Sequence, residues 1–425
     1  MNSKILEKCG NLIQRHIILC GEYEEVVSFL EKYSNLMTIK AVVTNHKSDV
    51  KKQPYENWGI DCILFEEINL DNELIIICDK TRFGVHKKIF WHHGLEEYKD
   101  YMSVELIECI LTKKDLMLCM GTHLMQQVCR LMSESKNLSE KYSIVFYPEK
   151  ELKEAYMNRF QELLHVARCC DVFVRSSCQE KFYYLKVPEA KQLSAECKII
   201  TVSDYGFGGY FPQVLNDRDV LSNYFFRERM RLEMSYETLA FSRVDKEMEL
   251  LCEDGMPVKN IVEKLMDEHY FEREYVQSVF KNEICRFKAL EKEDDIKLGE
   301  FIEQHANECL CRNLNEWNEP VVSYVTEKLL HVLGVPNDLL LSIEERQKKI
   351  EECSGSEILI YPSVRDALQL TAELQSKKYK VVTFYDTKYM TAWEYAEYLA
   401  TYLYRSMDLM KFTGLDQSLR ENEQE

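Results

Sequence analysis

Leu116-Met-Leu-Cys-Met-Gly-Thr-His-Leu-Met-Gln126 is the stretch of sequence that decides the fold class. A run of apolar residues comes first, then Gly121, Thr122 and His123, and an amphipathic run begins at Leu124. This order predicts a strand, a tight turn and the start of a helix. In a parallel sheet such a turn lies at the carboxyl edge, where open α/β sheets usually bind their ligands. We therefore expect any reactive centre of this protein at this turn, with His123 in it.

Strand-like and helix-like segments alternate on both sides of this turn. Before it, we expect a helix over Glu24–Tyr33, a second helix that ends near His93, and these strands: Arg15–Cys20, Thr38–Thr44, Asp61–Phe65 and Leu74–Cys78. After it, we expect a helix over 151–168 and strands over 142–147, 171–175 and 198–202. The alternation predicts parallel, doubly wound sheets, so the fold class is α/β. From Arg218 to Leu333 the pattern is helical, which gives the second α/β domain a large helical portion.

The length of 425 residues predicts two or three domains. We expect an α/β domain over residues 1–105 and a second one, with a helical second half, over 112–345. A C-terminal α/β extension over 346–412 and a polar tail over 413–425 complete the predicted organisation.

The net charge of −18 argues against a general nucleic-acid binder, which would show a basic face. A local basic pocket for a phosphorylated cofactor is compatible with it. No apolar run approaches the roughly 20 residues that span a bilayer, and the N-terminus lacks a signal-peptide pattern. We therefore expect a cytoplasmic protein with no transmembrane segment. The 16 cysteines mostly lie in apolar runs and are interpreted as buried thiols. His305, Cys309 and Cys311 could form a metal cluster, but on a helix Cys311 would point away from the other two, so no metal site is predicted.

The turn after the first predicted strand has one glycine, Gly21, followed by Glu22, Tyr23 and Glu24. A dinucleotide site needs further glycines so that the backbone can approach the pyrophosphate, and here carboxylates would face the phosphates. We therefore expect a structural or docking role for the N-terminal domain.

Two later segments each leave two interpretations open. The loop Ser203-Asp-Tyr-Gly-Phe-Gly-Gly-Tyr-Phe-Pro-Gln213 is either the lining of a site or a well-packed aromatic turn. The arginines at 227, 229 and 231 are either phosphate contacts or a solvated helix face. Arg175 and Arg218 are further candidates for holding the phosphates of a cofactor.

Several short motifs occur in one order over more than half of the chain. They are Gly121-Thr-His-Leu124, the Asp-Val-Phe strand at Asp171, Phe207-Gly-Gly-Tyr-Phe-Pro-Gln213, Asn318-Glu-Pro320 and Ile360-Tyr-Pro-Ser-Val364. With these motifs, residues 115–345 resemble the WcbI-type polysaccharide biosynthesis family, which is found with bacterial capsule and glycan genes. The N-terminal domain resembles the Rossmann-like domains that are often joined to sugar-modifying enzymes.

The resemblance implies binding of coenzyme A or acetyl-CoA and transfer of an acetyl group to a sugar or glycan acceptor. This chain departs from the family pattern at two places. Thr122-His123 stands where the family has Asn-Cys, and Asn318-Glu319-Pro320 stands where the family has Asn-His-Pro. The family's cysteine is therefore absent at the first turn, and its histidine is absent at the second.

Acetyl transfer to a hydroxyl needs a base, donors for the developing oxyanion, and contact between donor and acceptor. We expect His123 as the base and Glu319 as the carboxylate that orients it, with Asp204 as an alternative. The expected cofactor contacts are Gly121, Thr122, Tyr210, Arg227 and Arg229.

Two other functions remain open. The altered motifs are also what a non-catalytic binding or scaffold protein of the same glycan pathway would show. A hydrolase with Thr122 or Ser203 as nucleophile is a third interpretation, because Thr122 is next to a candidate base.

Overall fold

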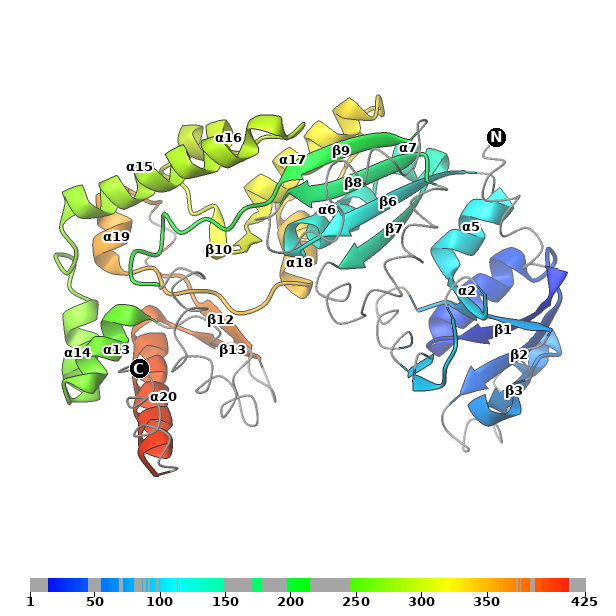
Figure 1. Ribbon diagram of the computed structural model, residues 1–425, viewed down its shortest axis with the longest axis horizontal. Coiled ribbons are helices and arrows are strands. Elements are labelled where there is room, and N and C mark those ends of the chain that lie inside the picture. The colour runs from blue at the N-terminus through cyan, green and yellow to red at the C-terminus, as the bar shows by residue number, and fades with distance from the viewer. Residues whose placement is uncertain are drawn as a thin grey trace, which may run out of the picture. The chain divides into compact units, whose positions relative to one another are not determined.

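The computed structural model describes residues 14–44, 55–68, 72–79, 86, 89–90, 92–96, 99–112, 114–148, 170–177, 197–214, 245–371, 374, 376–382 and 387–412. Strands and helices alternate through much of this part of the chain, so the protein is mixed α/β, as the sequence predicts (Figure 1). The predicted helix over 151–168 and the predicted polar tail lie outside the described residues. Within those residues, no helix has the length and apolar character needed to cross a membrane.

The first sheet is parallel, with strand order β3-β2-β1-β4-β5, which is the order of the first five strands of a Rossmann fold. Its strands are β1 (His16–Cys20), β2 (Ile39–Thr44), β3 (Asp61–Leu64), β4 (Glu73–Ile77) and β5 (Tyr101–Ser103). The helical elements between them are α2 (Tyr23–Tyr33), η2 (Glu56–Trp58) and η3 (Phe65–Glu67). The four predicted strands are confirmed, whereas β5 is too short to produce a periodic signal. The strand order reverses between β1 and β4, which is the switch point of this sheet.

The second sheet has the order β7-β6-β8-β9. It consists of β6 (Asp115–Gly121), β7 (Tyr142–Pro148), β8 (Val172–Ser177) and β9 (Lys198–Ser203). Helix α5 (Val104–Thr112) leads into β6, and α6 (His123–Met132) and α7 (Lys136–Lys141) follow it. Strand β6 pairs with both β7 and β8 in parallel. The next strand in the chain, β7, lies on one side of β6, and β8 lies on the other side. The switch point of this sheet is therefore between β6 and β8.

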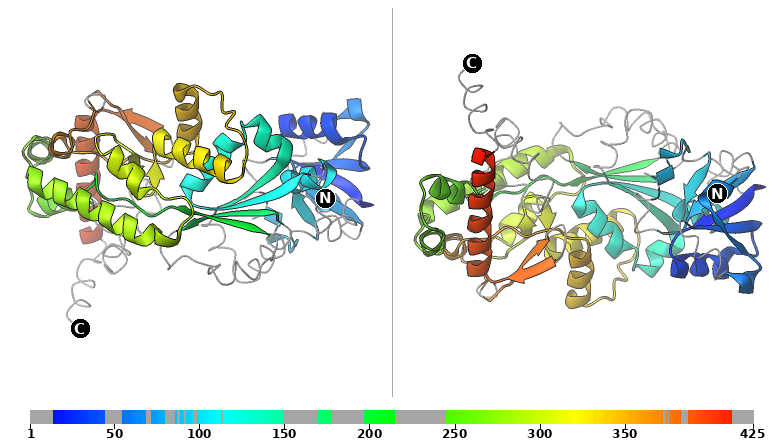
Figure 2. Two further views of the ribbon diagram at one scale, coloured as in Figure 1. Left: turned by 90° about the horizontal axis from the view of Figure 1, so that it is seen from above. Right: turned by 90° about the horizontal axis from the view of Figure 1, so that it is seen from below.

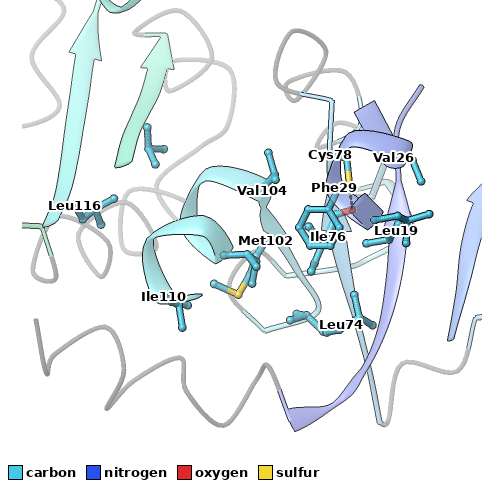
Figure 3. Close-up of a cluster of buried hydrophobic side chains, with 14 of the residues drawn as sticks. Leu19, Val26, Phe29, Leu74, Ile76, Cys78, Met102, Val104, Ile110 and Leu116 are labelled. Carbon is cyan, nitrogen blue, oxygen red and sulfur yellow. Dashed lines mark hydrogen bonds between the residues drawn. The ribbon is translucent and has the colours of Figure 1, made fainter. Parts of the chain in front are cut away.

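One cluster of buried apolar side chains is shared by these two sheets and α5. Figure 3 shows Met102, Val104 and Ile110 between Leu116 of β6 and a group of side chains from the first sheet that includes Leu74. Leu116 and Leu74 are fully buried. Removal of this apolar surface from water stabilises the sheets and α5 together, at about 25 cal/mol for each Å².

The helical portion contains α13 (Lys246–Glu253), α14 (Val258–Leu265), α15 (Arg273–Leu290), η6 (Glu291–Glu293), α16 (Gly299–Gln304) and α17 (Glu319–Val332). Pro257 caps α14, as its position in the sequence suggests. The expectation of a helix that ends near Arg312 is wrong, because β10 (Cys311–Asn313) and β11 (Glu316–Trp317) form a hairpin there. The side chain of Asn313 accepts a hydrogen bond from the backbone of Asn315, a local turn that competes with helix formation.

The C-terminal part contains α18 (Ile343–Glu352), α19 (Pro362–Ala367), β12 (Tyr379–Val382), β13 (Thr387–Met390) and α20 (Ala392–Phe412). Strands β12 and β13 form an antiparallel hairpin. Helix α20, red in both views of Figure 2, packs beside α13 and α14, which are green. The C-terminal part therefore shares its packing with the helical portion that precedes it.

The chain divides into two compact units. The first unit holds residues 1–201 and 329–339, and the second holds 202–328 and 340–425. The first sheet lies in the first unit, and so does the second sheet except for the end of β9. Most of the helical portion and the C-terminal part belong to the second unit.

Candidate functional site

The turn after β6 has the geometry that the sequence predicts. Strand β6 ends at Gly121, Thr122 is extended, and α6 begins at His123. The first hydrogen bond of the helix runs from the backbone N–H of Gln126 to the carbonyl of Thr122. The N–H groups ahead of it have no acceptor within the helix, so the turn presents backbone donors at the carboxyl edge of the sheet. The His123 side chain is exposed, while Leu124 is buried and anchors the helix.

Gly121 is needed at this turn because β8 approaches closely. A Cβ atom on Gly121 would lie 2.0 Å from the Oγ of Ser176 and 2.8 Å from the Cβ of Met125. The parallel register pairs Met120 with Arg175, which brings Ser176 beside the glycine. The absence of a side chain therefore lets the ends of β6 and β8 meet at the switch point.

The end of β8 places three polar side chains in the interior. Arg175, Ser176 and Ser177 are 2%, 4% and 3% exposed. Among the described residues, the Ser176 hydroxyl has no hydrogen-bond partner. A buried polar group without a partner costs free energy, and such groups are concentrated where ligands bind. Arg175 is a candidate from the sequence, whereas the two serines were not predicted; their signal is their position at the end of the strand, directly after Arg175.

The loop after β9 is an aromatic core. Phe207 packs edge-on against Tyr210, Phe280 and Phe287, with ring centroids 5.5 to 6.3 Å apart. Tyr210 is fully buried and its hydroxyl donates to the carbonyl of Glu308 at 2.7 Å. Burial raises the pKa of Tyr210 well above its usual value, so the phenol stays neutral. These contacts match the interpretation of the loop as a well-packed aromatic turn.

Two charged residues of α15 hold the backbone of this loop. The Arg286 guanidinium donates to the carbonyl of Gly206, and a Glu283 carboxylate oxygen accepts from the N–H of Gly208 at 3.0 Å. Arg286 and Glu283 are themselves paired at 2.8 Å. Asp204, at the start of the loop, is 5% exposed.

Ser203 lies beside two buried carboxylates of the second unit. Its Oγ is 2.9 Å from Glu291 Oε2 and 3.0 Å from Asp294 Oδ2, and the side chain has no exposed surface. Glu291 also accepts from the N–H groups of Leu298 and Gly299. This network joins the end of β9 to η6 and the start of α16. A hydroxyl enclosed in this way has no access to a hydrolase substrate.

Glu319 occupies the first turn of α17 and is held by two donors. Its Oε1 accepts from Ser323 at 2.6 Å and from the Arg346 guanidinium at 2.5 Å, and the residue is 9% exposed. Asn318, just before it, donates to the carbonyl of Cys309 at 2.6 Å. The Glu319 carboxylate is therefore fixed in place and faces a cation from α18.

His305, Cys309 and Cys311 make separate contacts and do not form a cluster. His305 stacks on Phe301, with 4.1 Å between ring centroids, and the Cys309 thiol donates to the carbonyl of Cys311. Burial raises the pKa of the Cys311 thiol well above its usual value. No group of metal-ligand residues occurs in the described part of the chain.

Comparison with known proteins assigns the central segment to a family. The model of the family described as polysaccharide biosynthesis enzyme WcbI matches residues 129–338, just under half of the chain. This segment is a WcbI-family domain. It begins within α6, after the Gly121–His123 turn, and takes in the end of β8, the aromatic loop and Glu319.

A solved structure gives the same fold assignment. It is described as WcbI, a novel polysaccharide biosynthesis enzyme, in its native form without a disulfide bond between coenzyme A and a cysteine. It is similar to this chain with a TM-score of 0.50 at 12% sequence identity, over 69% of this chain and 90% of that chain. At this identity the similarity concerns the fold. No curated protein matches the sequence.

The predicted site residues fall into three groups. Gly121, Thr122 and His123 belong to the first compact unit, and Asp204, Tyr210 and Glu319 belong to the second. The arginines at 227 and 229, like those at 218 and 231, lie outside the described residues. Of the five candidate arginines, the structure describes Arg175, which joins the group at the β6–β8 switch point.

Proposed function

We propose that the protein transfers an acetyl group from acetyl-CoA to a hydroxyl group of a sugar, with release of coenzyme A, in bacterial capsular or surface polysaccharide biosynthesis. The observation that carries the proposal is the β6–β8 switch point, where Gly121 leaves room for Ser176 beneath the N-terminus of α6. Ser176 lies within the segment that the WcbI family model matches, Gly121 precedes that segment, and coenzyme A is named for the solved WcbI structure.

The residues at the switch point fit a phosphorylated cofactor. The buried guanidinium of Arg175, the hydroxyls of Ser176 and Ser177, and the first N–H groups of α6 are all donors that phosphate oxygens accept from. We propose Gly121, Thr122, Arg227 and Arg229 as further cofactor contacts, whereas the expected contact Tyr210 is fully buried and its hydroxyl donates to the carbonyl of Glu308. A bound acetyl-CoA supplies an acetyl group that is activated at its carbonyl carbon.

The side chains of the chain itself would act on the acceptor. We propose that the exposed imidazole of His123 takes the proton from the sugar hydroxyl. The N–H groups of Thr122, His123 and Leu124 are positioned by the start of α6 to stabilise negative charge that develops nearby. Glu319, which Arg346 and Ser323 hold in place, is proposed to orient His123, with Asp204 as the alternative.

Cofactor binding is tested by calorimetry of the full chain with coenzyme A. We expect Ser176→Ala to weaken binding about tenfold, the effect of one hydrogen bond to a charged group. Because the Ser176 hydroxyl has no partner among the described residues, the same change should leave the melting temperature unchanged or raise it. Wild-type binding by Ser176→Ala would refute the placement of the cofactor.

Catalysis is tested by acetyl transfer from acetyl-CoA to a panel of sugars. We expect His123→Ala to lower the rate by about 10²-fold or more, the usual contribution of a general base. His269→Ala, in an exposed loop of the second unit, is the matched control and should keep the wild-type rate. Coenzyme A binding without turnover for any acceptor would instead support a non-catalytic binding or scaffold protein, the function that the altered motifs also allow.

A further inference from the structure

Cys20, His86 and Asp79 lie together at the carboxyl edge of the first sheet, and the proposed function does not use them. Strand β1 ends at Cys20, and β4 is followed by Cys78 and Asp79, so the group lies at the switch point between β1 and β4. The Cys78 N–H donates to the Cys20 carbonyl at 2.7 Å. A Cβ on Gly21 would lie 3.1 Å from the backbone nitrogen of Asp79, so the glycine permits this close approach.

Cys20, His86 and Asp79 form a continuous row of contacts. The Cys20 Sγ is 3.5 Å from His86 Nδ1, and His86 Nε2 is 3.7 Å from Asp79 Oδ2. Cys20 is 7% exposed and Asp79 is 1% exposed, whereas the His86 side chain keeps 19% of its surface accessible. The row is therefore mostly buried and has its opening at the histidine.

The geometry argues for a proton relay and against a metal site. The thiol and the carboxylate contact opposite nitrogen atoms of the imidazole, so a single ion cannot bind all three side chains. Opposite nitrogens are what a nucleophile, a base and an orienting carboxylate need, because the base accepts a proton on one side while the carboxylate fixes the ring on the other.

The thiol requires a base in order to react. Burial, together with the negative charge of Asp79, raises the pKa of Cys20 to about 12, so the sulfur keeps its proton at neutral pH. A thiol in this state is a poor nucleophile unless its proton leaves during attack. The His86 nitrogen in contact with the sulfur is placed to accept that proton.

The charge around the opening selects the class of substrate. Glu24 and Glu25 lie in the first turn of α2, directly after the Cys20–Gly21 end of β1, and Glu22 precedes them. These carboxylates repel phosphates and other anions at this edge. An uncharged acyl compound, such as a neutral ester, meets no such repulsion.

We propose that Cys20 is a nucleophilic thiol that accepts acyl groups from uncharged esters, with His86 as its base and Asp79 as the residue that positions the base. The sulfur forms a bond to the carbonyl carbon while the S–H proton passes to His86 Nδ1. The bond between the carbonyl carbon and the leaving oxygen then breaks, and the proton passes from His86 to that oxygen. The product is an acyl thioester on Cys20 and a free alcohol or phenol.

The test uses the full chain and p-nitrophenyl acetate, an uncharged ester, with each cysteine followed by peptide mass spectrometry. Cys62 and Cys78 are the internal controls, because they lie in or beside the same sheet and are 5% and 2% exposed, close to Cys20. We expect Cys20 to be acetylated at least tenfold faster than either control. Equal rates for the three thiols would overturn the proposal, and the contact between Cys20 and His86 would then be a structural hydrogen bond.

Variants test the roles of His86 and Asp79 separately. We expect His86→Gln to slow acetylation of Cys20 by about 10²-fold, the usual contribution of a general base, and to leave Cys62 unchanged. Asp79→Asn should shift the midpoint of the pH–rate profile of Cys20 to lower pH, because the negative charge of Asp79 raises the pKa of the Cys20 thiol. An unchanged profile would exclude the positioning role of Asp79, and an unchanged rate in His86→Gln would overturn the proposal. Should a variant fail to fold, the comparison of the three thiols in the wild-type protein still decides.

Discussion

Gly121 has no side chain, and the Ser176 hydroxyl occupies the space that one would fill. This contact explains how the ends of β6 and β8 come close enough to gather polar groups beside His123. His123, Ser176 and Gly121 differ in how closely the surrounding structure encloses them. His123 is exposed, Ser176 is buried without a partner among the described residues, and Gly121 tolerates no Cβ.

The Gly121 contact gives a prediction at the scale of the residue. Gly121→Ala should lower the free energy of unfolding by about 1–3 kcal/mol, because overpacking a filled site forces neighbouring atoms to move. Adding Ser176→Gly should recover part of the loss, since it removes both Ser176 atoms that the new methyl group would meet. Urea denaturation of the two single variants and the double variant measures the coupling. Additive effects would show that the two residues do not touch.

At the scale of elements, the C-terminal part is joined to the β10–β11 hairpin by buried charges. The Arg312 guanidinium, 5% exposed, contacts Glu357 at 2.9 Å and Glu351 at 3.6 Å. The backbone of Ile358 also donates to the carbonyl of Arg312 at 2.8 Å. The hairpin that the sequence analysis missed is therefore the element to which the segment after α18 is bonded.

Removal of the Arg312 guanidinium tests whether its ion pairs hold the C-terminal part to the hairpin. Arg312→Met should destabilise the protein by about 3–5 kcal/mol, because Glu357 is left buried with less compensation. Lys259→Met, which removes an exposed ion pair with Glu263, is the matched control and should cost less than about 1 kcal/mol. Both are measured as the free energy of unfolding in urea. Similar small losses in the two variants would show that the Arg312 network does not hold the C-terminal part.

The stability of the whole molecule should depend on pH through Asp245. This residue is buried, caps α13 by accepting from the N–H of Met248, and accepts from the Tyr361 hydroxyl at 2.5 Å. Burial raises the pKa of Asp245 to about 7, and neighbouring Glu247 adds to the increase. A folded-state pKa above the unfolded value means that the folded protein holds the proton more tightly.

The sign of the pH effect follows from this linkage. The contribution of Asp245 is fully present below about pH 4, where both states are protonated, and is lost as the pH rises to about 7. The loss is on the order of 4 kcal/mol at most. Asp245→Asn removes it, so this variant should gain stability relative to the wild type between pH 4 and pH 7. The measurement is the difference in unfolding free energy between the two proteins at several pH values, and a constant difference would contradict the prediction.

The sequence by itself determined the parallel strands and the strand–turn–helix at Gly121–His123. Apolar runs of β length, alternating with amphipathic helices, are local patterns, and burial of one face or of both faces imposes them on the sequence directly. The motif order also indicated the WcbI family, which the match over residues 129–338 supports. Short elements gave no such signal, so β5 and the β10–β11 hairpin were not predicted.

Only the tertiary structure decided which polar side chains meet. The Ser176 hydroxyl reaches Gly121 because β6 and β8 pair in parallel. Glu319 of α17 meets Arg346 of α18, although 27 positions separate them in the chain. Cys20 contacts His86 across the switch point of the first sheet, although 66 positions separate them in the chain. Periodicity reports which face of an element is buried, but the strand order and register that join distant residues arise from packing among elements, so no local pattern contains them.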